Sequence, residues 1–215
     1  MTPTTPRRKR TYDPRATRAR ILDVASGEFQ QRGYHATSMH DVMRLAAVPG
    51  GSVYHYFPTK KSLGLAVIEE RVAGMVLQTW IEPINTASSA SEGVVAVFDS
   101  VAASLDGNGA VSGCPLNNLA LELSLADPDF QRALRAIFDQ WERTIAQRFR
   151  DDLDAGILRT VDPQGMATFV VASFSGAMSL AKAAQNAAPV RACRHELARL
   201  LPQPSAPSSR QSPRR

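Results

Sequence analysis

Three Asp-Pro dipeptides place the strongest constraint on how this chain folds. Asp13-Pro14, Asp127-Pro128 and Asp162-Pro163 each precede a stretch in which apolar residues recur every three to four positions. An aspartate can cap the free N–H groups of a helix start, and proline fits the first turn because no backbone donor is needed there. Each dipeptide therefore predicts a helix start, and no stretch shows the two-residue period of a strand. The expected fold class is all-α.

Two short helices are expected within residues 37–57. Thr37 or Ser38 caps the first, and Val48-Pro49-Gly50-Gly51 separates it from a second helix over residues 52–57. Two short helices joined by a tight turn form the helix-turn-helix unit, whose second helix enters the major groove of DNA. With a preceding helix that ends at Gly33, they predict an N-terminal three-helix DNA-binding domain. Its expected core is Ile21, Leu22, Phe29, Met39, Val42, Leu45, Val53 and Phe57.

A larger helical domain for ligand binding and dimerisation is expected to follow. Its first helix starts at Thr59 and continues through Trp80, and Pro83 is expected to break it. Further helices are predicted over residues 88–105, 115–125, 128–156, 163–182 and 189–201. The predicted domains are a disordered basic arm (1–12), the helix-turn-helix domain (13–62), the helical regulatory domain (63–201) and a disordered tail (202–215).

The charge is unevenly distributed along the chain. Residues 1–62 carry eleven Lys and Arg against four Asp and Glu, whereas residues 63–201 carry eleven against sixteen. A net positive charge on residues 1–62, followed by a net negative charge on residues 63–201, suits an N-terminal module that neutralises DNA phosphates. Duplex DNA is therefore the expected partner.

Several other classes of protein find no support in the sequence. The two cysteines have neither a metal-site spacing nor a disulfide framework, and the longest apolar runs are too short to span a membrane. No apolar stretch follows the basic run Arg7-Arg8-Lys9-Arg10, so a secretory signal is not expected. No nucleophile–base pair, phosphate loop or metal-spaced set suggests an enzyme. We expect a cytoplasmic protein with no cofactor, no metal and no membrane partner.

Small residues crowd the helix expected over residues 163–182, among them Gly165, Ala172, Ser175 and Gly176. They permit close helix–helix approach, either within one chain or between two copies. Helix-turn-helix proteins commonly bind paired half-sites, which favours a homodimer formed by the last two helices.

The front of the chain resembles the TetR family of bacterial transcriptional repressors. The resemblance covers about fifty residues and rests on these segments: Arg20–Ala25, Phe29–Ser38, Asp41-Val42, Ala46–Val48, Gly51–Phe57 and Lys60–Leu63. A second segment, Gly113–Leu123, is similar to a branch of the family with a Gly-Cys-x-Leu-x-Asn-Leu-like sequence in the helical domain. Pro49 and Gly50 depart from the common pattern, which affects operator preference rather than DNA binding itself.

The resemblance implies which residues meet DNA. Gly51, Ser52, Tyr54 and His55 are expected to face the groove or its flanking phosphates. Lys60 is expected to anchor a phosphate. Two alternatives stay open for three further residues: Tyr56 packs or reaches phosphate, and Thr37 and Ser38 bind phosphate or only cap their helix. The basic run over residues 7–10 enters the minor groove or adds non-specific attraction.

An apolar pocket is expected in the helical domain, with the ordinary hydrophobic core as its alternative. The candidate lining residues are Phe98, Leu119, Phe138, Trp141, Phe174 and Met178, with Asn117, Asn118 and Glu122 as polar contacts. A small-molecule inducer bound there would lower operator affinity by swinging the helix over residues 60–80.

Cys114 is expected at a helix N-terminus, where the helix dipole lowers the pKa of a thiol. It is either a sensor of oxidants or electrophiles, with Lys182 as a nearby partner for the thiolate, or a half-buried packing residue. Cys193 is expected to pack on an apolar face.

The leading hypothesis is a dimeric repressor that binds a palindromic operator and is released by a ligand or an electrophile. One alternative is a DNA-binding protein that does not distinguish sequences. The other is an enzyme that uses the pocket of the helical domain.

Overall fold

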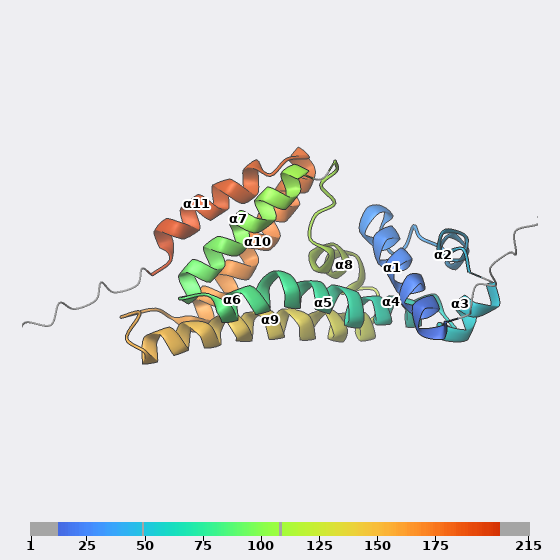
Figure 1. Cartoon of the computed structure of the whole chain (residues 1–215), viewed down its shortest axis with the longest axis horizontal. Coiled ribbons are helices and arrows are strands. Elements are labelled where there is room, and N and C mark those ends of the chain that lie inside the picture. Colours follow the sequence, from blue (N-terminus) through green and yellow to red (C-terminus); the bar gives the residue numbers. More distant parts are fainter. Residues whose placement is uncertain (1–12, 49, 108, 203–215) are drawn as a thin grey trace, which may run out of the picture. The chain divides into compact units, whose positions relative to one another are not determined.

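The structure is a computed structural model that describes residues 13–48, 50–107 and 109–202 (Figure 1). All regular secondary structure in these ranges is helical, as predicted. The predictions for the basic arm (1–12), for Pro49 and for the tail beyond Pro202 lie outside the described residues.

The chain separates into two compact units, the head (Met1–Val67) and the body (Ile68–Arg215). The division falls at the end of helix α4 (Lys60–Val67). The boundary predicted between residues 62 and 63 lies inside that helix.

Four helices form the head: α1 (Pro14–Arg32), α2 (Met39–Ala46), α3 (Gly50–Tyr56) and α4. The carboxylate of Asp13 caps α1 by accepting from the backbone N–H groups of Arg15 at 2.9 Å and Ala16 at 3.3 Å. Gly33 ends α1 with a φ of 90°, a conformation that favours glycine. These local signals explain why the start and end of α1 were predictable.

The head core contains most of the residues predicted for it: Ile21, Leu22, Phe29, Val42, Val53 and Phe57 are all buried. Two predictions were wrong, because Leu45 is 39% exposed and Met39 is only half-buried. Helix α2 has eight residues, and only Val42 and Ala46 lie on its buried face. Leu45 and Met39 flank that face, which explains the error.

The body begins with a helical segment of four stretches that alternate between π-helical and α-helical winding. It consists of η1 (Ile68–Val72), α5 (Ala73–Val76), η2 (Leu77–Ile81) and α6 (Glu82–Thr86), where η1 and η2 are π-helical. The predicted break at Pro83 was wrong, since the chain stays helical to Thr86. The change of winding after Ile81 puts Pro83 in the first turn of α6, where the missing N–H of proline costs little.

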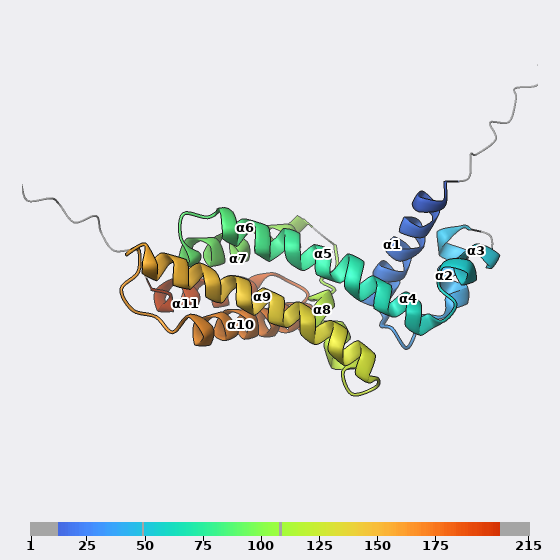
Figure 2. The ribbon, with the colours of Figure 1, turned by 90° about the horizontal axis from the view of Figure 1, so that it is seen from below.

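Five longer helices complete the body: α7 (Ala90–Gly107), α8 (Pro115–Leu123), α9 (Pro128–Asp154), α10 (Pro163–Ala184) and α11 (Ala188–Leu200). Helix α9 lies along the segment η1–α6 on one side and α10 on the other, while α11 packs on α7 and α10 (Figure 2). The prediction that α8 reaches Leu125 was wrong: the helix ends at Leu123, and Leu125 is fully exposed.

A buried ion pair joins α9 to the connection between α6 and α7. Asp152 is fully buried, pairs with Arg148, and accepts from the backbone N–H of Ala90 at 2.6 Å. The guanidinium of Arg148 also donates to the carbonyl oxygen of Ala87 at 2.9 Å. One carboxylate therefore stabilises both the start of α7 and the end of α9.

Helix α10 is, within the described ranges, the one helix that is long and apolar enough to cross a membrane by length and composition. The unbroken apolar runs of α10 are short, but alanines between the larger residues keep its mean hydropathy high. Seven residues of α10 are nevertheless buried, and the helix packs between α9 and α11. This packing is that of a core helix.

Candidate functional site

Helix α3 has a buried and an exposed side, with Ser52 and Tyr56 half-buried between them. Val53 and Phe57 are buried in the head core, as predicted. Tyr54 is 50% exposed, and His55 is exposed beside it. The side chains expected to reach DNA are therefore available at the surface of the head.

Gly51 lies exposed in the first turn of α3, and the fold does not require a glycine there. A Cβ atom at this position would have no neighbouring atom within 4 Å. Its φ is not in the left-handed region, so an alanine would fit the backbone. Glycine in a helix is less stable than alanine, so its presence here suits the close approach of something outside the head.

Tyr56 and Thr37 both have structural partners. The phenol of Tyr56 donates to the carbonyl oxygen of Pro14 at 3.0 Å, which favours the packing interpretation. Thr37 is 1% exposed, and its hydroxyl donates to the carbonyl oxygen of Gly33 at 2.9 Å. The expectation of a phosphate contact from the Thr37 side chain is thus at odds with its burial, because the hydroxyl cannot reach a ligand at the surface.

Ser38 is the N-cap of α2 and remains exposed. Its hydroxyl accepts from the backbone N–H of Asp41 at 3.1 Å, and the Asp41 carboxylate accepts from the Ser38 backbone N–H at 3.1 Å, which completes a capping box. The hydrogen bonds from the side chain and backbone of Ser38 lower the pKa of the Asp41 carboxyl. Ser38 therefore has a capping role whether or not it also contacts phosphate.

Lys60 starts α4 at the surface of the head. Its ammonium donates to the carbonyl oxygen of His35 at 3.2 Å and lies 4.4 Å from the centre of the Tyr34 ring. These contacts hold the charge close to the connection between α1 and α2. An ammonium has three N–H donors, so a phosphate contact is compatible with this geometry.

An aromatic cluster fills the centre of the body. Trp80 of η2 lies 4.8 Å from Trp141 of α9, 4.8 Å from Phe174 of α10 and 5.8 Å from Phe98 of α7, between ring centres. Phe138 stacks on Trp141 at 6.4 Å. The structure brings together the predicted aromatic residues and adds Trp80, which the sequence predicted only as part of a helix. Met178 is buried on the same helix as Phe174.

The predicted polar contacts belong to a different place, the junction of α8 with α10. Asn117 donates to the hydroxyl of Ser179 at 3.0 Å, and Asn118 donates to the carbonyl oxygen of Ser112 at 2.8 Å. Lys182 donates to the Asn118 side-chain oxygen at 3.5 Å. Glu122 is half-buried farther along α8. The hydrogen bonds of both asparagines therefore go to this junction and not to the aromatic cluster.

Cys114 is the N-cap residue of α8, but its thiol does not have the predicted lowered pKa. The side chain is buried, and burial raises the pKa of the thiol above its ordinary value, although the backbone N–H groups of Asn117 and Leu116 act in the opposite direction. Gly113 beside it has a φ of 83°, and a Cβ there would lie 3.1 Å from Cδ of Lys182. Lys182 thus runs past Gly113, while Cys193 is half-buried on α11.

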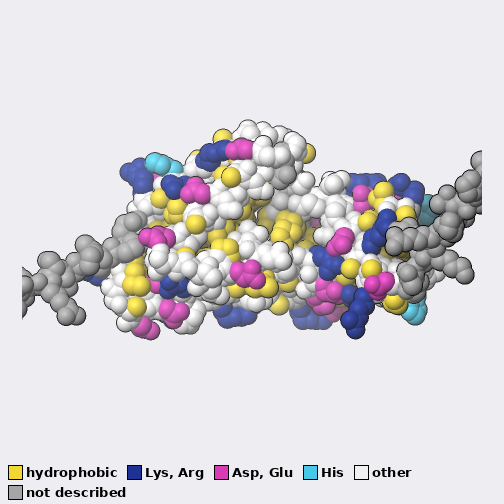
Figure 3. Space-filling view, in the orientation of Figure 1, with side chains coloured by type: hydrophobic (Ala, Val, Ile, Leu, Met, Phe, Trp, Pro, Cys, Tyr) yellow, Lys and Arg dark blue, Asp and Glu magenta, His cyan; other side chains and the backbone are white. Residues whose placement is uncertain are grey.

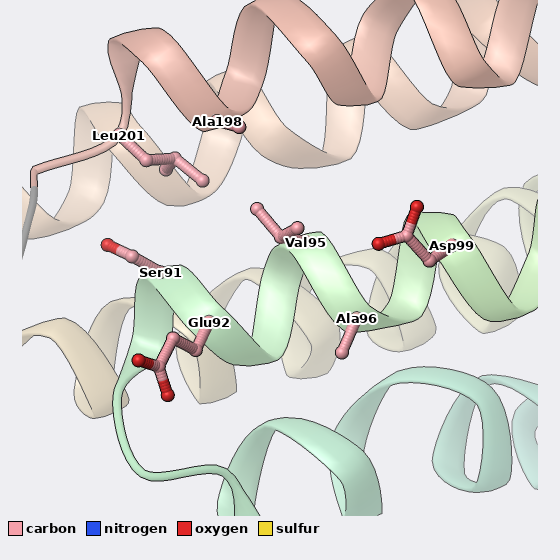
Figure 4. A pocket seen from close by; sticks show the side chains of 7 residues that line it. All are labelled: Ser91, Glu92, Val95, Ala96, Asp99, Ala198 and Leu201. Carbon is pink, nitrogen blue, oxygen red and sulfur yellow. The ribbon is translucent and has the colours of Figure 1, made fainter.

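Two of the surface grooves in the described part of the body contain none of the predicted pocket residues. One of about 290 Å³ lies between α7 and α11, where Val95 and Asp99 point toward α11 (Figure 4). Arg194 of α11 holds the Asp99 carboxylate through hydrogen bonds of 2.9 to 3.1 Å. The other, of about 380 Å³, has only polar and charged lining residues, from α6 and α9. The described residues contain no group of three metal-ligating side chains.

Large hydrophobic side chains also reach the surface among charged ones (Figure 3). Those on the body include Leu77, Leu121, Leu125, Phe169, Leu180 and Leu200. Three of them, Phe169, Leu180 and Leu200, belong to α10 and α11.

Both units match known protein families. Residues 21–67 match the model of bacterial regulatory proteins of the tetR family, and residues 90–196 match the C-terminal domain of LmrA/YxaF-like transcriptional regulators. The transcriptional regulator AcuR of Cereibacter sphaeroides is 30% identical over 188 residues, which cover 84% of this chain and 84% of AcuR. The repressor DhaR of Mycobacterium sp. (strain GP1) is 29% identical over 181 residues, 80% of this chain and 86% of DhaR.

The fold also has counterparts among solved structures. The crystal structure of the reduced form of Escherichia coli NemR has a TM-score of 0.80 against this chain, with 22% identity, and the match covers 89% of this chain and 99% of NemR. At this identity the likeness concerns the fold alone.

Proposed function

Because the chain belongs to the TetR family of bacterial transcriptional regulators, we propose that it is a homodimeric repressor that binds a palindromic operator and leaves it when the body takes up an inducer. It is a DNA-binding transcriptional regulator and not an enzyme. Dimerisation, the palindromic operator and induction are the proposed part.

The observation that carries the proposal is the exposed side of α3. Gly51, Ser52, Tyr54 and His55 are the residues proposed to meet the major groove and its phosphates, with Ser38 and Lys60 at its border. The empty space around a Cβ at Gly51 supports this assignment, because the fold itself gains nothing from a glycine there.

A competition titration tests operator binding. The probe is an inverted repeat from the DNA flanking the protein's own coding region, and the competitor is a scrambled duplex at the same salt concentration. We expect strong preference for the repeat, and loss of that preference in Tyr54→Ala. Leu125→Ala, at a fully exposed position on the body, is the control and should bind like the unaltered protein. Equal affinity for both duplexes would instead favour sequence-blind binding.

Helices α10 and α11 are the proposed dimer interface. Phe169, Leu180 and Leu200 are large apolar side chains left exposed on these helices in the single chain. Gly176 is exposed on α10, and a Cβ there would meet nothing within 4 Å. Gly176→Arg should therefore leave the fold of one chain intact while it prevents dimerisation. Sedimentation velocity measures this, and a dimer in the variant would contradict the assignment.

The helical segment over residues 60–81 is the proposed route of induction, since the chain passes through it from the head into the body. The segment contains the two π-helical stretches η1 and η2. The π-helix is rare in proteins, and where it occurs it is often at a functional site. An inducer that binds only one conformation changes operator affinity by its differential affinity, typically about 1–3 kcal/mol. Such a change corresponds to about a 5- to 150-fold loss of operator binding.

Induction by an electrophile at Cys114 is the second candidate, favoured by the position of Lys182 beside Gly113. The raised pKa of the buried thiol argues against it, because the thiolate is the reactive form. Operator release by a mild electrophile should be compared between the unaltered protein and Cys114→Ser. Equal release would eliminate this thiol as the trigger.

A cytoplasmic location follows from the proposed role, because the operator lies on chromosomal DNA.

A further inference from the structure

Two buried hydrogen-bond donors in the aromatic cluster have no acceptor. Trp80 and Trp141 are each 1% exposed, and within the described part of the chain their indole Nε1 atoms have no hydrogen-bond partner. Buried polar groups in folded proteins are nearly always paired, so each exception calls for an explanation, such as a ligand or a water that completes the bond. Here two exceptions lie on neighbouring rings, 4.8 Å apart between centres.

The rings that pack around these donors are aromatic. Phe98 and Phe174 lie edge-to-face against Trp80, at interplanar angles of 90° and 81°. Phe174 also packs at 79° against Trp141. Such walls favour flat apolar groups, and they offer an anion no countercharge. Aromatic faces attract cations, but a cation lacks the acceptor that the two N–H donors need. A ligand that fits here is neutral, mostly apolar, and brings its own acceptor.

The location connects such a ligand to four elements of the body. Trp80 belongs to η2, Phe98 to α7, Trp141 to α9 and Phe174 to α10. A hydrogen bond to Trp80 acts directly on one of the two π-helical stretches. The cluster is therefore a place where a small ligand could change the winding of the segment that starts the body.

We propose that the body binds a compact, neutral, aromatic or similarly flat carbonyl compound, whose oxygen accepts hydrogen bonds from the indole N–H groups of Trp80 and Trp141. That such a ligand releases the operator rests on the proposed function. The inference adds the chemical class of the inducer. The binding itself is a property of the body and can be measured without DNA.

The chain has two tryptophans, Trp80 and Trp141, so a protein labelled with ¹⁵N at the indole nitrogen gives two indole signals, both from this cluster. The probes are acetophenone and α-methylstyrene, which have nearly the same shape and differ in that C=O replaces C=CH₂. Trp80→Phe and Trp141→Phe assign the signals. We expect acetophenone to move at least one indole proton downfield, as hydrogen bonding does, and α-methylstyrene to cause no downfield shift.

Three results would overturn the inference. One is that both probes shift the signals equally, which shows apolar binding without acceptor recognition. Another is that neither probe moves them. The last is that both signals lie upfield and stay there, as expected when the N–H groups point at the faces of Phe98 and Phe174. The unaltered protein suffices for all three, so the outcome does not depend on the folding of a variant.

Affinity gives a second, independent measurement. Trp80→Phe or Trp141→Phe should weaken acetophenone binding by about 3- to 10-fold, the usual effect of losing one neutral hydrogen bond, and should change α-methylstyrene binding less. An equal effect on both probes would indicate lost packing and contradict the proposal.

Operator binding separates this inference from the proposed function. If acetophenone shifts the indole signals but leaves the operator complex intact, the site stands and carbonyl-driven induction fails. If the protein shows no operator preference at all, the proposed function fails, while the indole signals still decide the ligand class.

Discussion

The phenol O–H of Tyr56 donates a hydrogen bond to the carbonyl oxygen of Pro14 at 3.0 Å, which joins the end of α3 to the start of α1. These residues are 42 positions apart in the chain. Pro14 occupies the first turn of α1, so the bond fixes the orientation of the exposed helix α3 within the head.

Tyr56→Phe removes this hydrogen bond and keeps the ring. We expect the head to lose about 1 kcal/mol of unfolding free energy, the typical net contribution of one hydrogen bond. Thermal and urea unfolding measure this. Tyr54→Phe is the control: its half-exposed phenol should leave stability unchanged and weaken only operator binding. Weaker operator binding in Tyr56→Phe without a loss of stability would instead assign a phosphate contact to Tyr56.

Gly51→Ala should separate stability from DNA binding. Alanine at this helical position should stabilise the head by about 0.4–1 kcal/mol, because the unfolded chain loses conformational freedom and the new Cβ meets no neighbour. The same methyl group should weaken operator binding about tenfold or more by blocking close approach to the duplex, an effect of about 1.4 kcal/mol.

Gly27→Ala on α1 is the matched control for Gly51→Ala. A Cβ at Gly27 likewise meets nothing within 4 Å. This variant should gain a similar stability and bind the operator normally. If both alanine variants bind DNA equally well, Gly51 has no role at the interface.

Asp152→Ala should destabilise the body strongly. The variant leaves the Arg148 guanidinium and the Ala90 N–H without their shared carboxylate in a buried position. Removing one partner of a buried ion pair typically costs about 3–5 kcal/mol. Asp139→Ala removes the exposed pair with Arg135, and it should change the unfolding free energy by less than about 1 kcal/mol. Urea unfolding of both variants makes the comparison.

The Cys114 thiol should react slowly near neutral pH. Because burial raises its pKa, iodoacetamide should alkylate Cys114 more slowly than the half-buried Cys193, measured by mass spectrometry in Cys193→Ser and Cys114→Ser. Faster alkylation of Cys114 would restore it as the more reactive thiol.

The same raised pKa makes stability depend on pH. In the unfolded chain the thiol loses its proton near its ordinary pKa, whereas the folded state retains the proton to higher pH. The contribution of Cys114 to stability is therefore fully present below the ordinary value of 9.0 and falls as the pH rises above it. Cys114→Ser should remove this part of the alkaline loss of stability.

Local signals determined most helix boundaries. Asp13 and Gly33 bracket α1 through contacts with residues at most four positions away, and Asp127-Pro128 and Asp162-Pro163 start α9 and α10 in the same way. Such signals depend on backbone geometry within one turn. The exposed residues of α3 could be named for a similar reason, since the resemblance covers this short segment in register.

Tertiary packing decided the rest. Pro83 continues a helix because a π-helical stretch precedes it, and Thr37 is buried because α1 ends beside it. The Cys114 pKa follows from burial, which outweighs the local N–H groups that a sequence can indicate. The pairing of Trp80 with Trp141 joins residues 61 positions apart, and no local pattern marks it. The sequence alone determined where most helices begin and which family the chain resembles, since those signals lie within short segments. Only the folded body, through long-range packing, decided which polar groups are left buried without a partner.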